Sequence, residues 1–297
     1  MTAIPATLPR RADRYPRPVR LDAGEATLSG VVAEPVDQPL RGLIVAIHGA
    51  GMDARYFDAP SAAEASLLGL APRLGFAALA IDRPGHGATS GGQFVDRSIE
   101  GQAHALGQAI SAYRERADIG AGVCLLGHSF GGKVAVTLAY QGDADLVGLD
   151  ISGCGFHYRG GTLQHLDGRR MSRLGWGPPS YYPEGTFTAM RGATSDFDAG
   201  EVAQAQDWPY AFERVAAQVR VPVRMTFAER EPWWRSDSDE LAAIERAFVR
   251  APSVEISTQP YAGHNLSLGL AARSYHLAAV AFFERCLLAR QLHRTRP

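Results

Sequence analysis

The sequence lacks an excess of charge of either sign. Its 297 residues include 30 basic and 31 acidic side chains, which gives a formal net charge of −1. Proteins that hold nucleic acid or an anionic membrane surface usually concentrate positive charge, so this balance argues against both kinds of partner. Lysine is nearly missing as well, since Lys133 is the only lysine in the chain. We attribute this preference for arginine to the base composition of the genome before any function of the protein.

Cysteine is scarce, and long apolar runs are missing. Cys124, Cys154 and Cys286 lie far apart without a C-x-x-C pair, which favours small buried side chains over a disulfide or a metal site. No uninterrupted apolar span reaches the length of a membrane-spanning helix. Residues 1–18 contain prolines and arginines but no apolar core of signal-peptide length. We therefore expect a cytoplasmic protein with a flexible N-terminal leader and no metal or cofactor.

What the sequence does contain is a series of short apolar runs with helical segments between them. Two alternating runs between residues 19 and 35 predict a hairpin. Nearly continuous apolar runs, typical of strands covered on both faces, follow at residues 42–49, 76–82, 122–129 and 146–153. Segments of helical period separate them at residues 61–74, 98–115 and 130–140. This alternation predicts an α/β fold, with a mostly parallel twisted sheet flanked by helices.

The alternation stops after Cys154. Residues 157–218 are rich in glycine, proline, arginine and aromatic residues and show no strand pattern. Strand and helix patterns return at residues 221–229, 238–251, 253–258 and 274–292. We therefore predict a core made of residues 19–156 and 219–297. Residues 157–218 are expected to form a lid inserted over the carboxyl edge of the sheet.

Polar residues gather directly after the predicted strands, where an open parallel sheet binds its ligands. "HGAGMDARYFD" follows the first long strand and "DRPGHGATS" the next. Ser129, Glu231 and His264 follow three later strands. Because the carboxyl ends of parallel strands meet at one edge of the sheet, we expect these side chains to share a site.

The residues around Ser129 carry a resemblance to a known family. Residues 127–131, "GHSFG", match the G-x-S-x-G nucleophile elbow of the α/β-hydrolase superfamily and stand between a strand and a helix, as that motif requires. "HGAG" at residues 48–51 resembles the oxyanion loop of the family. "DRPGHGATS" is similar to its D-x-P-G-x-G-x-S turn. The resemblance covers most of the chain from about residue 19 and implies a serine hydrolase.

The resemblance also implies which groups assist Ser129. A serine hydroxyl is a poor nucleophile until a base takes its proton, and the family order of serine, acid and histidine points to Glu231 and His264. Aspartate is more usual as the acid, and Asp150 and Asp237 remain alternatives to Glu231. The N–H of Phe130 and an N–H of the oxyanion loop are expected to bind the oxyanion, the latter being Ala50 or Gly51.

The expected reaction is hydrolysis of a carboxylic ester, thioester or lactone through an acyl-enzyme on Ser129. The substrate is expected to be a small acyl compound with apolar bulk, held by aromatic residues that can equally serve as packing: Trp176, Tyr181, Trp208 and Trp233. One alternative is acyl transfer on the same triad. Another is release of acyl chains from an acyl carrier protein, whose phosphopantetheine would meet Arg169, Arg170 and Arg173. A third is a ligand-binding protein without turnover on the same scaffold.

Overall fold

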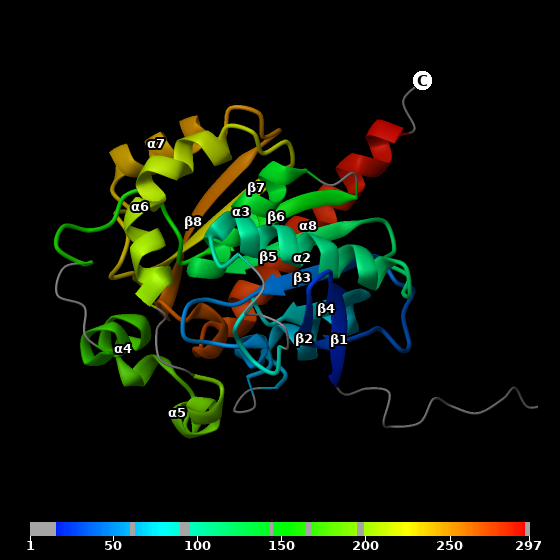
Figure 1. Ribbon diagram of the computed structural model, residues 1–297, viewed down its shortest axis with the longest axis horizontal. Coiled ribbons are helices and arrows are strands. Elements are labelled where there is room, and N and C mark those ends of the chain that lie inside the picture. Colours follow the sequence, from blue (N-terminus) through cyan, green and yellow to red (C-terminus); the bar gives the residue numbers. More distant parts are fainter. Residues whose placement is uncertain are drawn as a thin grey trace, which may run out of the picture.

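The computed structural model describes residues 16–59, 63–89, 96–142, 145–163, 168–194 and 199–294. Its centre is an eight-stranded sheet in the order β1-β2-β4-β3-β5-β6-β7-β8 (Figure 1). The strands are β1 (Arg17–Ala23), β2 (Ala26–Ala33), β3 (Gly42–Ile47), β4 (Phe76–Ile81), β5 (Val123–His128), β6 (Leu146–Ser152), β7 (Val223–Arg230) and β8 (Val254–Gly263). β2 pairs antiparallel with β1 and with β4, and the remaining pairs are parallel. The predicted α/β fold with its N-terminal hairpin is confirmed.

The described part of the chain forms helices close to each predicted segment, and further helices within residues 157–218, where none was predicted. They are α1 (Leu67–Leu70), α2 (Ile99–Arg114), α3 (Phe130–Gln141), α4 (Gly168–Trp176), α5 (Thr186–Ala189), α6 (Ala199–Ala216), α7 (Ser238–Ala247) and α8 (Ala272–Arg294). The helix expected over residues 61–74 is shorter than predicted. α1 ends at Leu70, and a 3-10 turn over Ala71–Leu74 follows it directly. Pro72 stands in this turn, and a proline, which has no N–H to donate, interrupts an α-helix.

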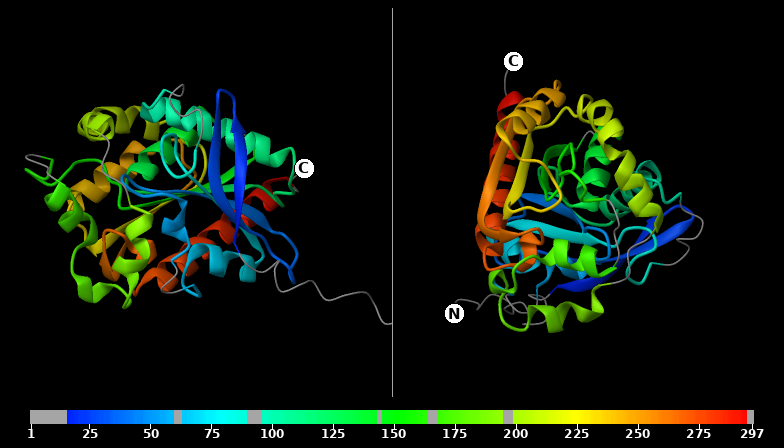
Figure 2. Two further views of the ribbon diagram at one scale, coloured as in Figure 1. Left: turned by 60° about the horizontal axis from the view of Figure 1, so that its bottom comes forward. Right: turned by 90° about the vertical axis from the view of Figure 1, so that its left-hand side faces the viewer.

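The central strands β3, β4, β5 and β6 are buried on both faces, which explains their continuous apolar sequences. In β3, Leu43, Val45 and Ile47 belong to a core shared with α2, α3, α6 and α7. Ile44 and Ala46, which alternate with them, belong to a second core shared with α1 and α8. Neighbouring strand residues point to opposite faces, so only a strand covered on both sides can be apolar throughout. Figure 2 shows the two helical layers on either side of the sheet.

The insertion, defined here as residues 153–222 between β6 and β7, contains the predicted lid. Its described residues form α4, α5, α6 and 3-10 turns without a named strand. These helices lie on the side toward which the parallel strands point (Figure 1). The inner face of α6 is part of the main core, because Trp208, Phe212 and Val215 are buried in the same cluster as α2 and α3. The insertion is therefore fixed to the core along α6.

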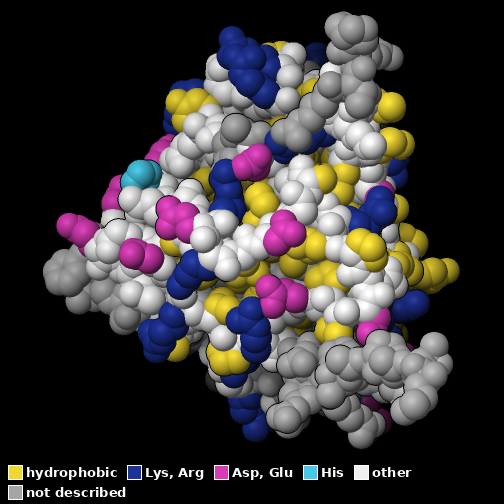
Figure 3. Space-filling model, turned by 90° about the vertical axis from the view of Figure 1, so that its right-hand side faces the viewer, with side chains coloured by type: hydrophobic (Ala, Val, Ile, Leu, Met, Phe, Trp, Pro, Cys, Tyr) yellow, Lys and Arg dark blue, Asp and Glu magenta, His cyan; other side chains and the backbone are white. Residues whose placement is uncertain are grey.

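The N-terminal leader predicted over residues 1–18 overlaps the sheet, because β1 begins at Arg17. Residues 1–15 lie outside the described part of the chain. Among the described helices, none is long and apolar enough to cross a membrane. Figure 3 shows the face on the right of Figure 1, where acidic and basic side chains are interspersed. This distribution agrees with the balanced charge of the sequence.

Candidate active site

Ser129 occupies a strained turn between β5 and α3. Its backbone has φ 54° and ψ −117°, a conformation that residues other than glycine rarely adopt. The turn leaves no room beside it. A Cβ on Gly131 would lie 2.3 Å from the carbonyl oxygen of Ile47, and one on Gly127 would lie 2.7 Å from the carbonyl oxygen of Gly131. The two glycines therefore allow a turn that presents the Ser129 hydroxyl at the N-terminus of α3.

His264 and Glu231 complete a chain of hydrogen bonds from Ser129. His264 follows β8 directly, and its Nε2 lies 2.9 Å from Ser129 Oγ. Its Nδ1 lies 3.0 Å from both carboxylate oxygens of Glu231, which follows β7. Glu231 Oε1 also accepts the N–H of Trp233 at 3.1 Å. With Nδ1–H donated to Glu231, Nε2 is free to accept the Ser129 proton, which is the arrangement of a nucleophile, a base and an orienting acid.

The two alternative acids lie elsewhere. Asp150 is fully buried within β6 and forms an ion pair with Arg224. Asp237 accepts the N–H of Glu240 at 3.1 Å as the N-cap of α7 and pairs with Arg235. Only Glu231, of the three carboxylates considered, is hydrogen-bonded to His264. Among the described residues, no group of three or more His, Cys, Asp or Glu side chains is arranged to hold a metal ion.

Two backbone N–H groups stand beside Ser129 without an acceptor. The N–H groups of Phe130 and Ala50 donate to no acceptor within the described part of the chain. Both residues line the cavity that contains Ser129, whereas Gly51 does not. The geometry therefore favours Ala50 over Gly51 as the second donor of an oxyanion hole.

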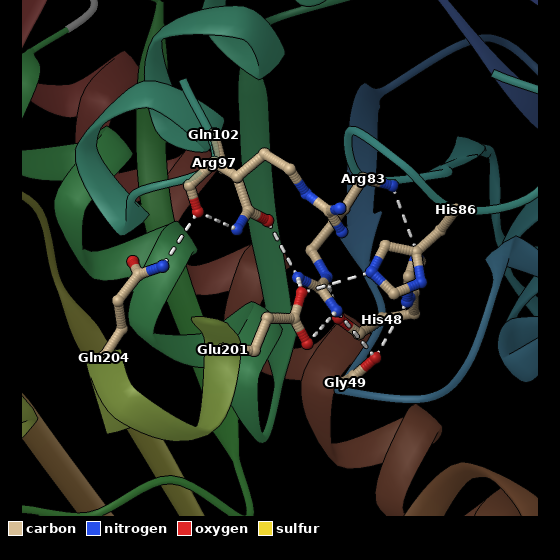
Figure 4. A network of polar contacts seen from close by, with 8 residues as sticks. All are labelled: His48, Gly49, Arg83, His86, Arg97, Gln102, Glu201 and Gln204. Atoms are coloured by element: carbon tan, nitrogen blue, oxygen red, sulfur yellow. Dashed lines mark hydrogen bonds and ion pairs between the residues drawn. The ribbon is translucent and has the colours of Figure 1, made fainter. Parts of the chain in front are cut away.

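Arg83 fixes the loop that carries Ala50. Its Nη2 donates to the carbonyl oxygen of Gly49 at 3.0 Å and its Nε to that of His48 at 3.0 Å (Figure 4). The N–H of Arg83 donates to His48 Nε2 at 3.0 Å, so His48 Nδ1 is the protonated nitrogen that faces Gly49 O at 2.9 Å. Because the C=O and N–H of a trans peptide point in opposite directions, binding the Gly49 carbonyl directs the Ala50 N–H away from Arg83.

Glu201 of α6 holds Arg83 from the insertion. Both of its carboxylate oxygens accept from Arg83, and Oε1 also lies 3.1 Å from His86 Nε2. The side-chain oxygen Oε1 of Gln102, on α2, accepts a hydrogen bond from Arg83 Nη1 at 2.8 Å (Figure 4). Arg83 is fully buried, and Glu201 is nearly so. Burial alone would raise the pKa of Glu201, but Arg83 and His86 together hold it well below its ordinary value. Sequence reasoning missed this pair, which only tertiary structure brings together.

A cavity of about 70 Å³ opens beside Ser129. Of the four aromatic residues expected to bind substrate, only Trp233 lines it. Trp208 is buried and donates Nε1–H to Gly155 O at 2.9 Å, so it serves the core. Trp176 and Tyr181 pack against the second core. The remaining lining residues in the described part of the chain are Ala50, Phe130, Lys133, Tyr158, Leu163, Glu201, Val202, Ala205 and Trp234.

Comparisons with known proteins agree with the fold of this chain. A family model described as the alpha/beta hydrolase family matches residues 44–281. No curated protein matches the sequence. Among solved structures, a soluble variant of monoglyceride lipase from Saccharomyces cerevisiae aligns with a TM-score of 0.67 at 14% identity, covering 96% of this chain and 99% of that one. E-2-(acetamidomethylene)succinate hydrolase aligns with a TM-score of 0.66 at 17% identity, and the alignment covers 91% of this chain and 100% of that one. A carboxyl esterase from Bacillus coagulans aligns with a TM-score of 0.65 at 16% identity, and the alignment covers 92% of this chain and 98% of the esterase.

The ion pair of Arg83 and Glu201 predicts a pH-dependent loss of stability. Glu201→Gln is expected to lower the free energy of unfolding by about 3 kcal/mol at pH 7, because it leaves a buried guanidinium without its counter-charge. The pKa of Glu201 in the folded protein lies below its ordinary value of 4.5. The stabilisation is therefore present above pH 4.5 and declines as the pH falls below it.

Urea unfolding of the wild type and the variant between pH 7 and pH 3.5 measures this difference. Glu213→Gln, an exposed position on the same helix, is the control and should change the free energy of unfolding by less than about 0.5 kcal/mol. A difference for Glu201→Gln that stays constant as the pH falls would contradict the assignment.

Proposed function

Since the chain belongs to the alpha/beta hydrolase family, we propose that it hydrolyses a carboxylic ester, thioester or lactone through an acyl-enzyme on Ser129. The observation that carries this proposal is the chain of hydrogen bonds from Ser129 through His264 to Glu231. Geometry of this kind supports activation of the serine, and the three residues come from three separate strand ends, as one site in a parallel sheet requires.

In the first half of the reaction, Ser129 Oγ attacks the substrate carbonyl carbon while its proton passes to His264 Nε2. Glu231 holds the imidazole and stabilises the imidazolium that forms. The carbonyl oxygen becomes an oxyanion, which accepts from the N–H groups of Phe130 and Ala50. Loss of one such donor typically costs about 3 kcal/mol of transition-state stabilisation. The C–O or C–S bond then breaks, and His264 returns the proton to the leaving alcohol or thiol.

In the second half, water takes the place of the leaving group. His264 removes a proton from water, the hydroxide oxygen attacks the acyl carbon, and the same two N–H groups bind the second oxyanion. Collapse of this intermediate releases the carboxylic acid, and Ser129 recovers its proton from His264. Acyl transfer differs only in that an alcohol or amine attacks instead of water.

The insertion acts in this proposal as a lid over the cavity. Tyr158, Leu163, Val202 and Ala205 belong to it and line the cavity opposite the core. Apolar walls exclude water and strengthen the electrostatic interactions within the site. The carrier-protein alternative rests on lid arginines and stays a prediction. Arg170 donates to Gly161 O, within the insertion itself, and the side chain of Arg169 lies outside the described part of the chain.

The nucleophile is tested with a fluorophosphonate probe, which reacts with activated serines. We expect one equivalent of label on the wild type and none on Ser129→Ala, measured by intact-protein mass. Ser267→Ala is the matched control, since Ser267 is a buried serine hydrogen-bonded to His276 rather than to His264. Labelling that persists in Ser129→Ala would contradict the nucleophile assignment.

The acid is tested by comparing two variants near the end of β7. Glu231→Gln should lower kcat for a nitrophenyl ester by roughly 10²–10⁴-fold, because the amide cannot stabilise the imidazolium and favours the wrong tautomer. Asp237→Asn is the control and should retain nearly full activity, since its side chain is exposed and caps α7. Circular dichroism establishes that both variants fold. Near-normal turnover by Glu231→Gln would overturn its role.

A further inference from the structure

The only lysine of the chain lies inside the candidate active site. Lys133 stands on α3 four residues after Ser129, which is the N-cap of that helix, so Lys133 lies about one turn into the helix from the nucleophile. It is 3% exposed, and it lines the same cavity as Ser129. Buried lysines are rare and usually paired. Its presence beside the nucleophile therefore requires a physical reason.

Lys133 has no polar partner among the residues that the structure describes. Across the described part of the chain, its Nζ forms no hydrogen bond and no ion pair. It is surrounded instead by four aromatic rings, whose centroids lie 4.7 Å away for Trp234, 5.6 Å for Phe130, and 5.8 Å for both Tyr158 and Trp208. Ring faces attract an ammonium ion and offset part of the cost of its burial. They leave its N–H groups without an acceptor.

A second side-chain donor, on a residue that lines the cavity, is also unpartnered. The Nε1–H of Trp233 is buried and has no hydrogen-bond partner among the described residues. Trp233 lines the cavity together with Lys133 and Ser129. Buried donors are nearly always satisfied in folded proteins. Besides the N–H groups of Phe130 and Ala50, two side-chain donors of residues that line this cavity are therefore unsatisfied, which indicates that its occupant supplies acceptors.

The acidic groups that act on Lys133 are already engaged. The Glu201 carboxylate accepts from Arg83 and faces His86, and the Glu231 carboxylate holds His264. Burial raises the pKa of the Cys154 thiol to about 11, so this group is neutral at pH 7. Arg83 adds positive charge from the other side. None of these groups accepts a hydrogen bond from Lys133, so the acceptor for its N–H groups is left to whatever enters the cavity.

We propose that Lys133 binds a free carboxylate of the substrate, so that the enzyme acts on esters, thioesters or lactones that carry a second, ionised carboxyl group. This inference rests on the proposed hydrolase function and names its substrate class. One carboxylate supplies two acceptor oxygens, which match the two unpartnered donors, and its single charge matches one ammonium. A cavity of about 70 Å³ suits a short group of this kind and not a long acyl chain.

Two matched pairs of esters test the proposal by pH-stat. Ethyl hydrogen succinate and ethyl butyrate differ by a carboxylate on the acyl side. Carboxymethyl butyrate and propyl butyrate differ by a carboxylate on the alcohol side. In at least one pair, Lys133→Met should lower the ratio of kcat/KM for the charged ester to that for the neutral ester by about 10–100-fold, the range of a charge-assisted hydrogen bond.

Trp233→Phe replaces the indole with a smaller aromatic ring and removes one neutral donor, and should lower the same ratio by about 2–10-fold. Equal effects of Lys133→Met on both members of each pair would assign Lys133 to packing and overturn the proposal. Failure of the wild type to turn over either charged ester, while it hydrolyses a neutral one, would also overturn it. If Ser129 takes no fluorophosphonate and no ester is cleaved, the hydrolase function itself fails.

A spectroscopic readout separates a bound anion from a structural role. Selective ¹⁵N-lysine labelling gives a single side-chain signal, because Lys133 is the only lysine. Burial lowers the pKa of this ammonium from its ordinary value, and an anion bound beside it raises the pKa again. Succinate titrated into full-length Ser129→Ala should therefore shift the Nζ signal and raise its pKa, whereas butanol should do neither. No response to succinate, with a folded spectrum, would contradict carboxylate binding at Lys133.

Discussion

The backbone turn at Ser129 is the constraint on which the rest of the site depends. A positive φ at a residue with a side chain is costly, and it persists only where the surroundings enforce it. Here β5 enters from the middle of the sheet, α3 leaves at once, and glycines at positions 127 and 131 let the two pack closely. The hydroxyl is thereby raised at the sheet edge where β7 and β8 deliver Glu231 and His264.

Buried charge organises the other side of the site. Arg83 binds the carbonyl groups of the His48–Gly49 loop, and Glu201 binds Arg83 from the insertion. The loop that offers the Ala50 N–H is therefore coupled to the helix that helps to enclose the cavity. Such a pair is stable only when both partners are present, because either charge alone would be buried without compensation. Placement of α6 and the backbone orientation of the His48–Gly49 loop thus depend on one interaction.

The sequence permits prediction of features that local patterns encode. Apolar runs predict the strands, and "GHSFG" between a strand and a helix predicts the turn at Ser129. Glu231 could not be separated from Asp150 and Asp237 by residue type, because only the fold shows that Asp150 pairs with Arg224 and that Asp237 caps a helix. The aromatic residues of the insertion were ambiguous, since their spacing does not reveal which ones reach the cavity. Tertiary contacts alone identify Glu201 and the aromatic surroundings of Lys133 as parts of the site.

The central claim is that an acyl group is transferred to Ser129. A nitrophenyl carbamate tests it directly, because a carbamoyl group leaves serine far more slowly than an acyl group and stays in place for peptide mapping. We expect loss of esterase activity in step with one carbamoyl group per chain, located on the peptide that contains Ser129. Inactivation with the carbamoyl group on another residue, or continued ester turnover by fully carbamoylated Ser129, would contradict it.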